Sequence, residues 1–389
     1  MLTHSQIRSG TPSRSAASTT DGGTGSRSAT GIVSAFCLLL LASCATTPKA
    51  PPPPVRPPHH VPLPPPPPPP VRIQEVRAVW VSETAKLDWD RAAKALQQAG
   101  FNTMYVNLLT GGAAFYPRSA VLPSLVAGDE VGRGIQLARS RGIAVHGKVI
   151  ATFMFRTPAD FQQRLIRENR VMRGPDGKPI LQAGYAWLCP SQPANRDLMV
   201  AAVREMLGRY PVDGVQLDYI RFCEQPSCYC AHCRQAHEQA TGRKTLEGTG
   251  FVQWKQQIIN DWMRAIAEAV RKARPGIVIS AAVFPDLEHA KEEKAQDWQH
   301  WLRAGYVDQL CPMIYSGDPQ EFARRLAQWP AWVPRGRSVI GVASWKCERM
   351  PDLWRQINAV RGSGLAGFAL FSYDDCAARG FLPDLTMGR

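Results

Sequence analysis

The stretch Tyr210-Pro-Val-Asp-Gly-Val-Gln-Leu-Asp-Tyr-Ile-Arg-Phe222 decides the fold of this chain, because it has the pattern of a buried strand that ends in a carboxylate. Side chains alternate across a strand, so one face carries Val215, Leu217 and Tyr219 and the other carries Gly214, Gln216, Asp218 and Ile220. In a closed parallel barrel the bulky face would pack beneath outer helices, and Asp218 would lie at the carboxyl end of the strand. Barrel enzymes place their chemistry there. The alternative is that Asp218 only caps the following loop.

Seven further apolar runs have the length and composition of strands, which makes eight in all: Val76–Ser82, Thr103–Leu109, Ala144–Ile150, Gly214–Ile220, Val278–Phe284, Asp308–Tyr315, Ser338–Ser344 and Gly367–Tyr373. Helical patterns lie between them, and several open with Asp, Asn or Pro and are followed by Gly: Asp88–Ala99, Asp129–Ser140, Asn195–Arg209, Phe251–Ala273, Asp297–Ala304, Pro319–Gln328 and Pro351–Arg361. This alternation predicts an α/β fold, a (β/α)8 TIM barrel. An open doubly wound sheet usually has fewer strands and a glycine-rich cofactor turn, which this sequence does not show.

The amino terminus has the features of a secretory signal. Ile32–Ala42 is apolar but too short to span a membrane comfortably, and it ends in Leu41-Ala42-Ser43-Cys44, which resembles a bacterial lipobox. We therefore expect residues 1–44 to be a lipoprotein signal peptide with Cys44 lipidated. Ala45 behind it resembles an outer-membrane sorting choice, which predicts an outer-membrane lipoprotein facing the periplasm. The alternative is an ordinary signal peptide with a chance cysteine.

A proline-rich segment follows at residues 45–72. Fifteen of the 25 residues from Pro48 to Arg72 are prolines, and few apolar side chains are present that could form a core. Proline-rich chains extend by about 3.1 Å per residue, so this segment could hold a domain about 75 Å from its anchor. We expect a disordered linker, followed by one large barrel domain over residues 73–389.

The charge of the chain is basic. It has 46 Lys and Arg against 32 Asp and Glu; six of those cations and one of those acids precede residue 73, which leaves 40 against 31 in the predicted domain. A basic surface suits an anionic polymer, although general solubility explains it equally well. The sequence contains no phosphate-binding glycine loop and no nucleic-acid-binding module, so no nucleic-acid partner is expected.

Motifs in a fixed order resemble the bacterial glycosyl-hydrolase-like family 10. They are Val76-Arg-Ala-Val-Trp-Val81 with Asp88-Trp89, Gly142-Ile-Ala-Val-His146, Asp176-Gly177, Trp187-Leu-Cys-Pro190, Asp213-Gly214 with Leu217-Asp-Tyr-Ile-Arg221, Pro312-Met-Ile-Tyr315 and Gly367-Phe-Ala-Leu-Phe-Ser-Tyr373. The resemblance implies a (β/α)8 barrel, secreted or lipid-anchored, that acts on glycans including peptidoglycan. Two positions depart from it: Cys189 stands where Asn is expected, and Asp218-Tyr219 stands where many members carry paired acids.

A more distant likeness is to family 18 chitinases. Five residues match their scheme for the fourth and sixth strands: Asp213, Gly214, Asp218, Met313 and Tyr315. However, Gln216 replaces the first inner Asp, and Ile220 replaces the Glu that donates the proton. The chitinase mechanism therefore cannot be carried over whole.

Glycosidic hydrolysis calls for two carboxyl groups, one to protonate the leaving oxygen and one to activate water or to attack carbon. We take Asp218 as the first and Asp286, beyond the neighbouring strand, as the second. Rivals for the second lie after other predicted strands: Glu83, Asp318, Asp374 and Asp375. Each of these acids could instead cap a helix or anchor a loop.

Substrate contacts are expected from aromatic faces and from amide and guanidinium groups, which suit sugar rings and hydroxyls. The candidates near predicted strand ends are Asn107, Arg221, Tyr315 and Trp345. Each aromatic side chain alone is more often part of a core than of a binding platform.

A cysteine-rich insertion at 222–250 follows the central strand. Cys223, Cys228, Cys230 and Cys233 lie within eleven residues, a density that favours tetrahedral Zn²⁺. Disulfides in an oxidising compartment are the alternative. Either would stiffen a loop at the mouth of the site, and other cysteines near predicted strand ends leave further bridges open.

Together these features predict a lipid-anchored envelope glycoside hydrolase whose polysaccharide substrate is peptidoglycan or a related glycan. We expect no cofactor for catalysis and a structural zinc as the one metal. The alternative is a barrel that binds cell-wall glycan without cutting it, because a fold does not settle activity.

Overall fold

The structure of the protein is a computed structural model that describes residues 75–223, 227–383 and 385. All of these residues belong to one compact unit, Arg72–Arg389. The predicted signal peptide at 1–44, the lipidation site Cys44 and the linker at 45–72 lie outside the described residues. Among the described helices, none combines the length and the apolar character needed to cross a membrane.

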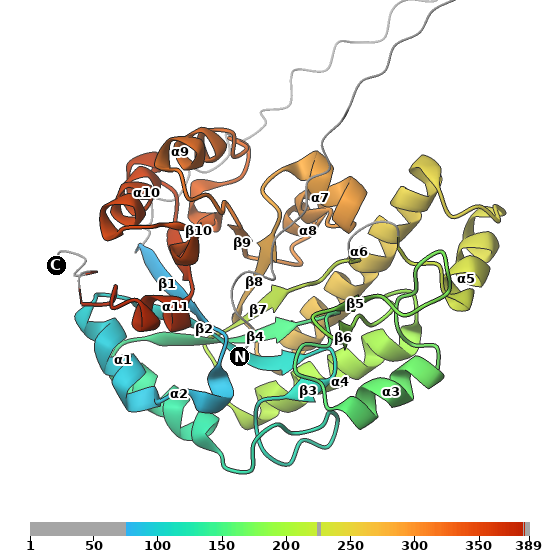
Figure 1. The fold of residues 1–389 in the computed structure, drawn as a ribbon, viewed down its shortest axis with the longest axis horizontal. Coiled ribbons are helices and arrows are strands. Elements are labelled where there is room, and N and C mark those ends of the chain that lie inside the picture. Colours follow the sequence, from blue (N-terminus) through green and yellow to red (C-terminus); the bar gives the residue numbers. More distant parts are fainter. Residues whose placement is uncertain (1–74, 224–226, 384, 386–389) are drawn as a thin grey trace, which may run out of the picture. The chain divides into compact units, whose positions relative to one another are not determined.

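Eight parallel strands form the centre of the domain (Figure 1). They are β1 (Val76–Val81), β2 (Thr103–Thr110), β4 (Ala144–Ile150), β7 (Gly214–Asp218), β8 (Val278–Val283), β9 (Gln309–Pro312), β10 (Val339–Ala343) and β11 (Gly367–Phe371). Their order is β10-β11-β1-β2-β4-β7-β8-β9, and parallel bridges from Leu310 to Ser338 and from Met313 to Gly341 join β9 to β10. The predicted (β/α)8 barrel is thereby confirmed.

The two faces of β7 separate as the alternation predicts. Val215 and Leu217 belong to the large apolar core between strands and helices. Gln216 points inward, where its side chain accepts from the Trp80 indole and donates to the Cys311 sulfur at 3.4 Å. Barrel interiors are packed in this way by side chains from several strands.

The predicted strand was too long at its carboxyl end. β7 ends at Asp218, because Tyr219 has a positive φ of 50°, a left-handed conformation that breaks the strand geometry. The alternation therefore does not extend to Tyr219 and Ile220 as expected.

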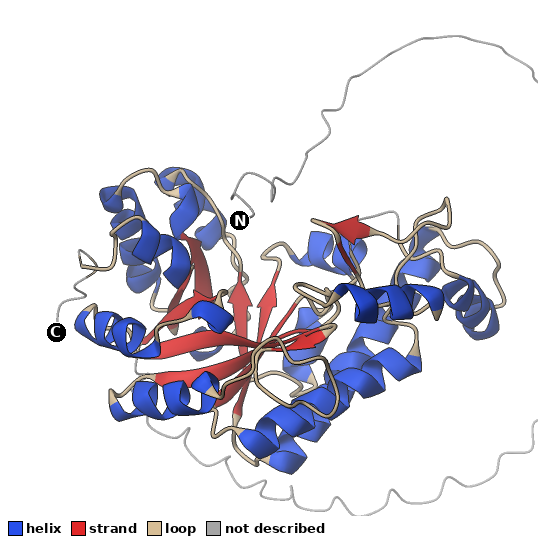
Figure 2. Cartoon of the chain, turned by 60° about the horizontal axis from the view of Figure 1, so that its bottom comes forward, coloured by secondary structure: helices blue, strands red, loops and turns tan. Residues whose placement is uncertain are grey.

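Helices surround the strands on the outside (Figure 2). The seven predicted helices correspond to α1 (Trp89–Gln98), α2 (Glu130–Ser140), α4 (Pro193–Arg209), α6 (Gly248–Ala273), α8 (Trp298–Arg303), α9 (Pro319–Ala327) and α10 (Met350–Ser363). The prediction missed shorter elements: α3 (Ala159–Arg167), α5 (Ala231–Thr241), α7 (Leu287–Lys294), α11 (Tyr373–Ala378), β3 (Ala113–Ala114), β5 (Leu181–Gln182), β6 (Tyr185–Ala186), and the 3-10 turns η2 (Thr84–Lys86), η3 (Arg335–Arg337) and η4 (Ser344–Lys346).

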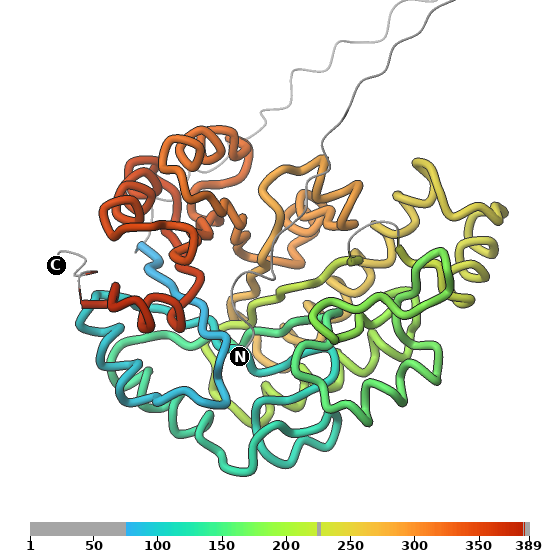
Figure 3. Tube along the Cα trace, in the orientation of Figure 1, coloured from blue at the N-terminus to red at the C-terminus, as the bar shows by residue number. Residues whose placement is uncertain are grey.

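Two connections on the carboxyl side of the barrel carry much of what surrounds the site. One runs from α3 through the β5–β6 hairpin to α4, and the other runs from β7 through α5 to α6. Figure 3 traces both segments, the first in green and the second in yellow. They touch directly, since the Tyr229 amide donates to the Arg173 carbonyl at 2.8 Å.

Candidate active site

The centre of the candidate site is an ion pair inside the mouth of the barrel. Lys148 Nζ on β4 lies 2.9 Å from Asp218 Oδ2 at the end of β7, and both residues are buried. The other carboxylate oxygen, Oδ1, accepts the Tyr219 amide at 2.8 Å. Asp218 thus pairs with a buried lysine at the strand end where barrel enzymes place catalytic groups.

Aromatic side chains from other strands of the barrel lie next to the Lys148–Asp218 ion pair. The Lys148 ammonium lies 5.8 Å from the centre of the Phe371 ring on β11, and the Tyr315 ring after β9 stacks on Phe371 at 6.0 Å. Burial, reinforced by the negative charge of Asp218, raises the pKa of Tyr315 well above its usual range. The Tyr315 hydroxyl is therefore a neutral donor close to the Asp218 carboxylate.

Arg221 forms a second part of the mouth, together with aromatic rings. Its guanidinium carbon lies 5.0 Å from the Trp187 ring centre, 4.8 Å from that of Tyr219 and 5.2 Å from that of Phe284. Phe153 stacks on Tyr219 at 5.2 Å and extends this group. Such desolvated cation–π contacts fix the cation and the rings together. Because Arg221, Trp187 and Phe153 are buried, this group forms a packed wall at the carboxyl end of β7.

The other two predicted substrate residues occupy different surroundings. Asn107 is 1% exposed, and its amide donates to the Ser82 carbonyl at 3.1 Å, so it ties β2 to the loop after β1. Trp345 in η4 is half-buried, and the Lys346 ammonium lies 5.3 Å from its ring centre. Lys346 also donates to the Tyr315 carbonyl at 3.4 Å, which connects Trp345 to the mouth. Substrate contact by either residue stays a prediction.

Asp286, the predicted second carboxyl group, lies at the amino terminus of α7. It is exposed, and its side chain accepts the His289 amide at 2.7 Å as a helix cap. Asp318 caps α9 in the same way. The structure therefore gives Asp286 a structural role, and its role in catalysis stays a prediction.

The rival acids after β1 and β11 lie closer to one another. Asp374 Oδ2 accepts the Ser82 amide at 2.9 Å, while Glu83 pairs with Arg156. Burial raises the pKa of Asp374 above its ordinary value, and the charge of Glu83 acts in the same direction. Asp375 is buried and accepts the Ser344 hydroxyl at 2.7 Å. Of these three acids, Asp374 has the surroundings that favour a protonated carboxyl group.

Sequence reasoning missed Lys148, Trp187 and Phe371. Lys148 lies in a predicted strand, Ala144–Ile150. Residues two apart in a strand share a face, so Lys148 and His146 would both have been placed on the inward face. Inward charge in a barrel needs a partner, so Lys148 and Asp218 could have been paired from register alone. The positions of Trp187 and Phe371 depend on loop geometry that alternation does not describe.

The cysteine-rich insertion brings together only three of the four predicted metal ligands. The sulfurs of Cys228, Cys230 and Cys233 lie within 4.8 Å of one another and of a fourth buried sulfur. That fourth sulfur belongs to Cys189, at the end of the segment that carries Trp187, and not to Cys223. The prediction took ligands close in sequence, whereas the fold supplies one from a neighbouring loop.

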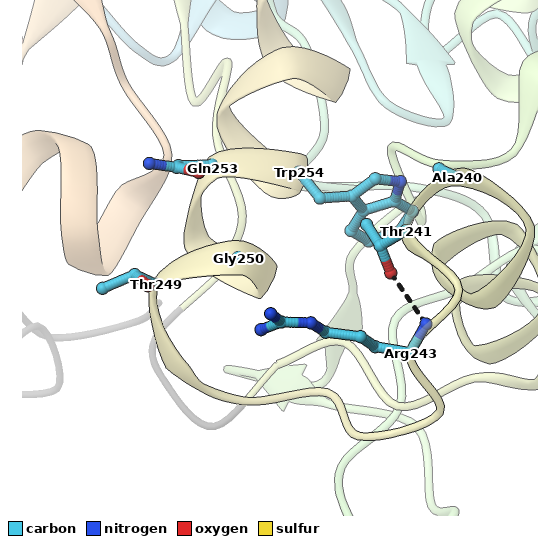
Figure 4. Close-up of a pocket in the computed structure, with 7 residues that line it drawn as sticks. All are labelled: Ala240, Thr241, Arg243, Thr249, Gly250, Gln253 and Trp254. Carbon is cyan, nitrogen blue, oxygen red and sulfur yellow. Dashed lines mark hydrogen bonds between the residues drawn. The ribbon is translucent and has the colours of Figure 1, made fainter. Parts of the chain in front are cut away.

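A pocket in the α5–α6 region is separate from these residues. Figure 4 shows its lining side chains, which come from α5, α6 and their connection: Ala240, Thr241, Arg243, Thr249, Gly250, Gln253 and Trp254. The Arg243 amide donates to the Thr241 hydroxyl at 3.2 Å. None of the predicted site residues lines this pocket, and we assign it no role.

The fold is a (β/α)8 barrel with a buried carboxylate and with cationic and aromatic side chains at the carboxyl ends of its strands, where barrel enzymes place their active sites. The sequence profile of the glycosyl hydrolase-like 10 family matches residues 75–339. The chain belongs to this family. The predicted family resemblance and the prediction of a glycoside hydrolase are confirmed at that level, with a glycan as the class of substrate.

Relatives with curated names are similar over most of their length. The glycosyl hydrolase DigH of Escherichia coli K12 is 26% identical over 337 residues, which cover 70% of this chain and 74% of the relative. The glycosyl hydrolase YngK of Bacillus subtilis 168 is 22% identical over 349 residues, which cover 75% and 67%. Among solved structures, the glycoside hydrolase domain of PgaB (BpsB) from Bordetella bronchiseptica has a TM-score of 0.62 at 12% identity. The match covers 81% of this chain and all of that domain, and it supports the fold alone.

Proposed function

We propose that this protein hydrolyses glycosidic bonds of a cell-envelope glycan, with peptidoglycan strands as its substrate, using Asp218 as the catalytic carboxylate. The observation that carries the proposal is the Asp218 carboxylate in the barrel mouth, 2.9 Å from Lys148 and beside aromatic and cationic side chains. Membership of a glycosyl hydrolase-like family supports the reaction class.

We assign Asp218, which pairs with Lys148, one of the two roles in glycoside hydrolysis. One carboxylate attacks the anomeric carbon or removes a proton from water, and a separate acid protonates the leaving oxygen. Tyr315 lies near Asp218, and its hydroxyl, which burial and the charge of Asp218 keep neutral, can donate to a sugar oxygen. The proton donor must therefore be a second group.

Asp374 and Asp286 are the two proposed proton donors. A general acid needs a pKa raised toward the working pH, and burial acts in that direction on Asp374. Asp286 is exposed, and its carboxylate caps α7. The burial of Asp374 favours that acid, and Asp286 stays in the proposal as the candidate that follows β8, the strand next to β7.

The substrate and the location follow from the amino-terminal sequence and from charge. The lipobox ending in Cys44 and the proline-rich segment at 45–72 support a lipid-anchored protein of the outer membrane that faces the periplasm. Peptidoglycan lies within reach of such a tether, and its carboxylates suit a domain with about nine excess positive charges. Arg221 and Lys346 place positive charge next to the aromatic mouth.

The substrate is tested by incubating residues 72–389, one compact unit, with intact sacculi, with glycan strands stripped of peptides and with chitin. Mass spectrometry of the soluble products would show new reducing ends released from one of the peptidoglycan substrates. Binding to sacculi without any release would instead support a barrel that recognises glycan without cutting it.

The catalytic role is tested by Asp218→Asn, which keeps the size of the side chain but removes its charge. We expect glycan release to fall by orders of magnitude while glycan binding changes little, because a nucleophile or base acts mainly on the rate. Asp374→Asn and Asp286→Asn, assayed beside it, show which acid is the donor. Full activity of folded Asp218→Asn would end the proposed mechanism.

The location is tested by Cys44→Ser. The Cys44→Ser variant lacks the thiol to which the lipid would be attached, whereas the apolar signal segment remains. We therefore expect the protein to be recovered either as soluble chain or as unprocessed precursor. Cell fractionation followed by immunoblotting measures this. Unchanged recovery in outer membranes would remove the lipoprotein assignment without affecting the enzymatic proposal.

A further inference from the structure

Four buried thiols form a compact cluster beside the barrel mouth. Cys189 ends the segment that carries Trp187, and Cys228, Cys230 and Cys233 belong to the connection that follows β7. Each of the four side chains is at most 1% exposed. Sulfur atoms from two distant segments are thus gathered at one point in the protein interior.

The distances from the Cys189 sulfur to the other three sulfurs are close to the edge length of a coordination tetrahedron. Cys189 Sγ lies 3.4 Å from Cys233 Sγ, 3.5 Å from Cys230 Sγ and 3.9 Å from Cys228 Sγ. A regular tetrahedron of sulfurs at a Zn–S distance of about 2.3 Å has edges of about 3.8 Å. A disulfide instead needs its two sulfurs about 2.05 Å apart. All four cysteines are free thiols in the structure. Cys189 is nearly equidistant from its three neighbours, so the geometry does not favour a disulfide between any one pair.

Polar hydrogens surround the sulfurs in the way that metal-bound thiolates require. The Arg173 amide donates to Cys228 Sγ at 3.3 Å, and the Cys233 amide donates to Cys230 Sγ at 3.4 Å. The Ser191 hydroxyl lies 3.1 Å from both Cys189 Sγ and Cys233 Sγ. Four thiolates with one divalent cation carry two negative charges, and such outer contacts disperse that charge and orient the ligands.

A buried cation lies next to the cluster. Lys255 on α6 is 1% exposed, and its ammonium donates to the carbonyl of Ser227, the residue before Cys228, at 3.5 Å. Its charge interacts first with Glu293 and then with the sulfurs of Cys223, Cys233 and Cys228. A buried ammonium is costly unless negative charge lies nearby. Thiolates in a metal centre would add to the negative charge that Glu293 provides.

We propose that Cys189, Cys228, Cys230 and Cys233 bind one structural Zn²⁺ that joins the 171–189 segment to the 227–241 segment. Tetrahedral four-sulfur sites select zinc or iron, and a closed set of four protein ligands is typical of structural sites. The metal fixes the loop that carries Trp187, and with it the rings that enclose Arg221. The site itself does not depend on the proposed catalytic reaction.

Metal content tests the site and its ligands. The full-length protein, purified without reducing agent or chelator, is expected to contain about one zinc per chain by mass spectrometry of the metal. Cys189→Ser should lower the zinc to background. Cys223→Ser is the matched control, since Cys223 is buried in the same connection but lies outside the cluster, and this variant should keep its zinc. Zinc retained in Cys189→Ser but lost from Cys223→Ser would overturn the assignment, as would iron in place of zinc.

A second measurement uses only the wild-type protein, in case Cys189→Ser fails to fold. Alkylation under denaturing conditions with chelator should modify all four cysteines; resistance of these four until a reductant is added would show disulfides and refute the site. Hydrogen exchange is then compared before and after zinc removal by a mercurial reagent. We expect faster exchange in 171–189 and 227–241, with β1 and β11 unchanged as internal references. Unchanged exchange in both segments would refute the joining role.

Discussion

His146 makes the stability of the barrel sensitive to acid. It lies on β4 among the inward side chains, and its ring centre is 5.3 Å from that of Tyr105. Its Nδ1 atom is buried without a hydrogen-bond partner among the described residues. Burial lowers the pKa of His146 from 6.5 to about 4, because the charged imidazolium would lose its hydration there.

The size of the effect follows from this pKa. The unfolded chain binds a proton at His146 below about pH 6.5, whereas the folded chain binds it only near pH 4. Between these values the unfolded state holds more protons, so the free energy of unfolding falls as the pH falls. At about 1.36 kcal/mol per pKa unit, His146 alone should remove about 3 kcal/mol between neutral pH and pH 4. The contribution is fully present above pH 6.5.

Urea unfolding at pH 7.5 and at pH 4 tests this expectation. His146→Gln cannot take up a proton, so it should lose about 3 kcal/mol less than the wild type between the two pH values, whatever its stability at pH 7.5. His300→Gln is the control, because His300 is exposed on α8 and this change should leave the difference unaltered. Equal pH dependence of wild type and His146→Gln would refute the reasoning.

Two further changes test the packing of the barrel interior. A Cβ added at Gly214 would lie 2.4 Å from His146 Nδ1, so Gly214→Ala should lower the unfolding free energy by about 1–3 kcal/mol. Gly208 has open space around it, so the control Gly208→Ala should not lower the unfolding free energy. Urea unfolding curves of both variants measure the difference. Lys148→Met should cost about 3–5 kcal/mol because it leaves the Asp218 charge buried without its cation, and adding Asp218→Asn should recover most of that loss in the double variant. A double variant no more stable than Lys148→Met would contradict the ion-pair account.

The fold could be predicted from the sequence because each strand is buried on both sides. Apolar runs bounded by helix-capping residues predict eight strands whose first and last residues are close to those observed. The predicted strand Ala144–Ile150, for example, has the same first and last residues as β4. Short elements were missed where their form depends on tertiary contacts. The β5–β6 hairpin and α5 have too few periodic apolar residues to identify them alone.

The site was less predictable because it is assembled from contacts between segments. Alternation placed Asp218 correctly at the inner end of β7, but the partner Lys148 is 70 positions earlier in the chain and becomes its neighbour only through the β4–β7 register. Cys189 likewise becomes a neighbour of distant residues only through the fold, since its sulfur lies beside those of three cysteines about 40 residues later in the chain. The departure from the family motif at position 189 was visible in the sequence, yet its reason lies in the fold.

The geometry of the acids distinguishes the carboxylates that cap helices from Asp218 more clearly than their sequence positions do. Five aspartates each accept an amide two or three residues ahead as the first turn of a helix begins: Asp88, Asp129, Asp286, Asp297 and Asp318. Asp218 ends a strand instead, and the next described helix begins at Ala231. Its carboxylate turns into the barrel toward a buried lysine, an arrangement that costs desolvation of two charges and that a loop cap does not need. Because a buried charge pair at the carboxyl end of a barrel strand lies where barrel enzymes place their chemistry, Asp218 comes first among the acids to be tested.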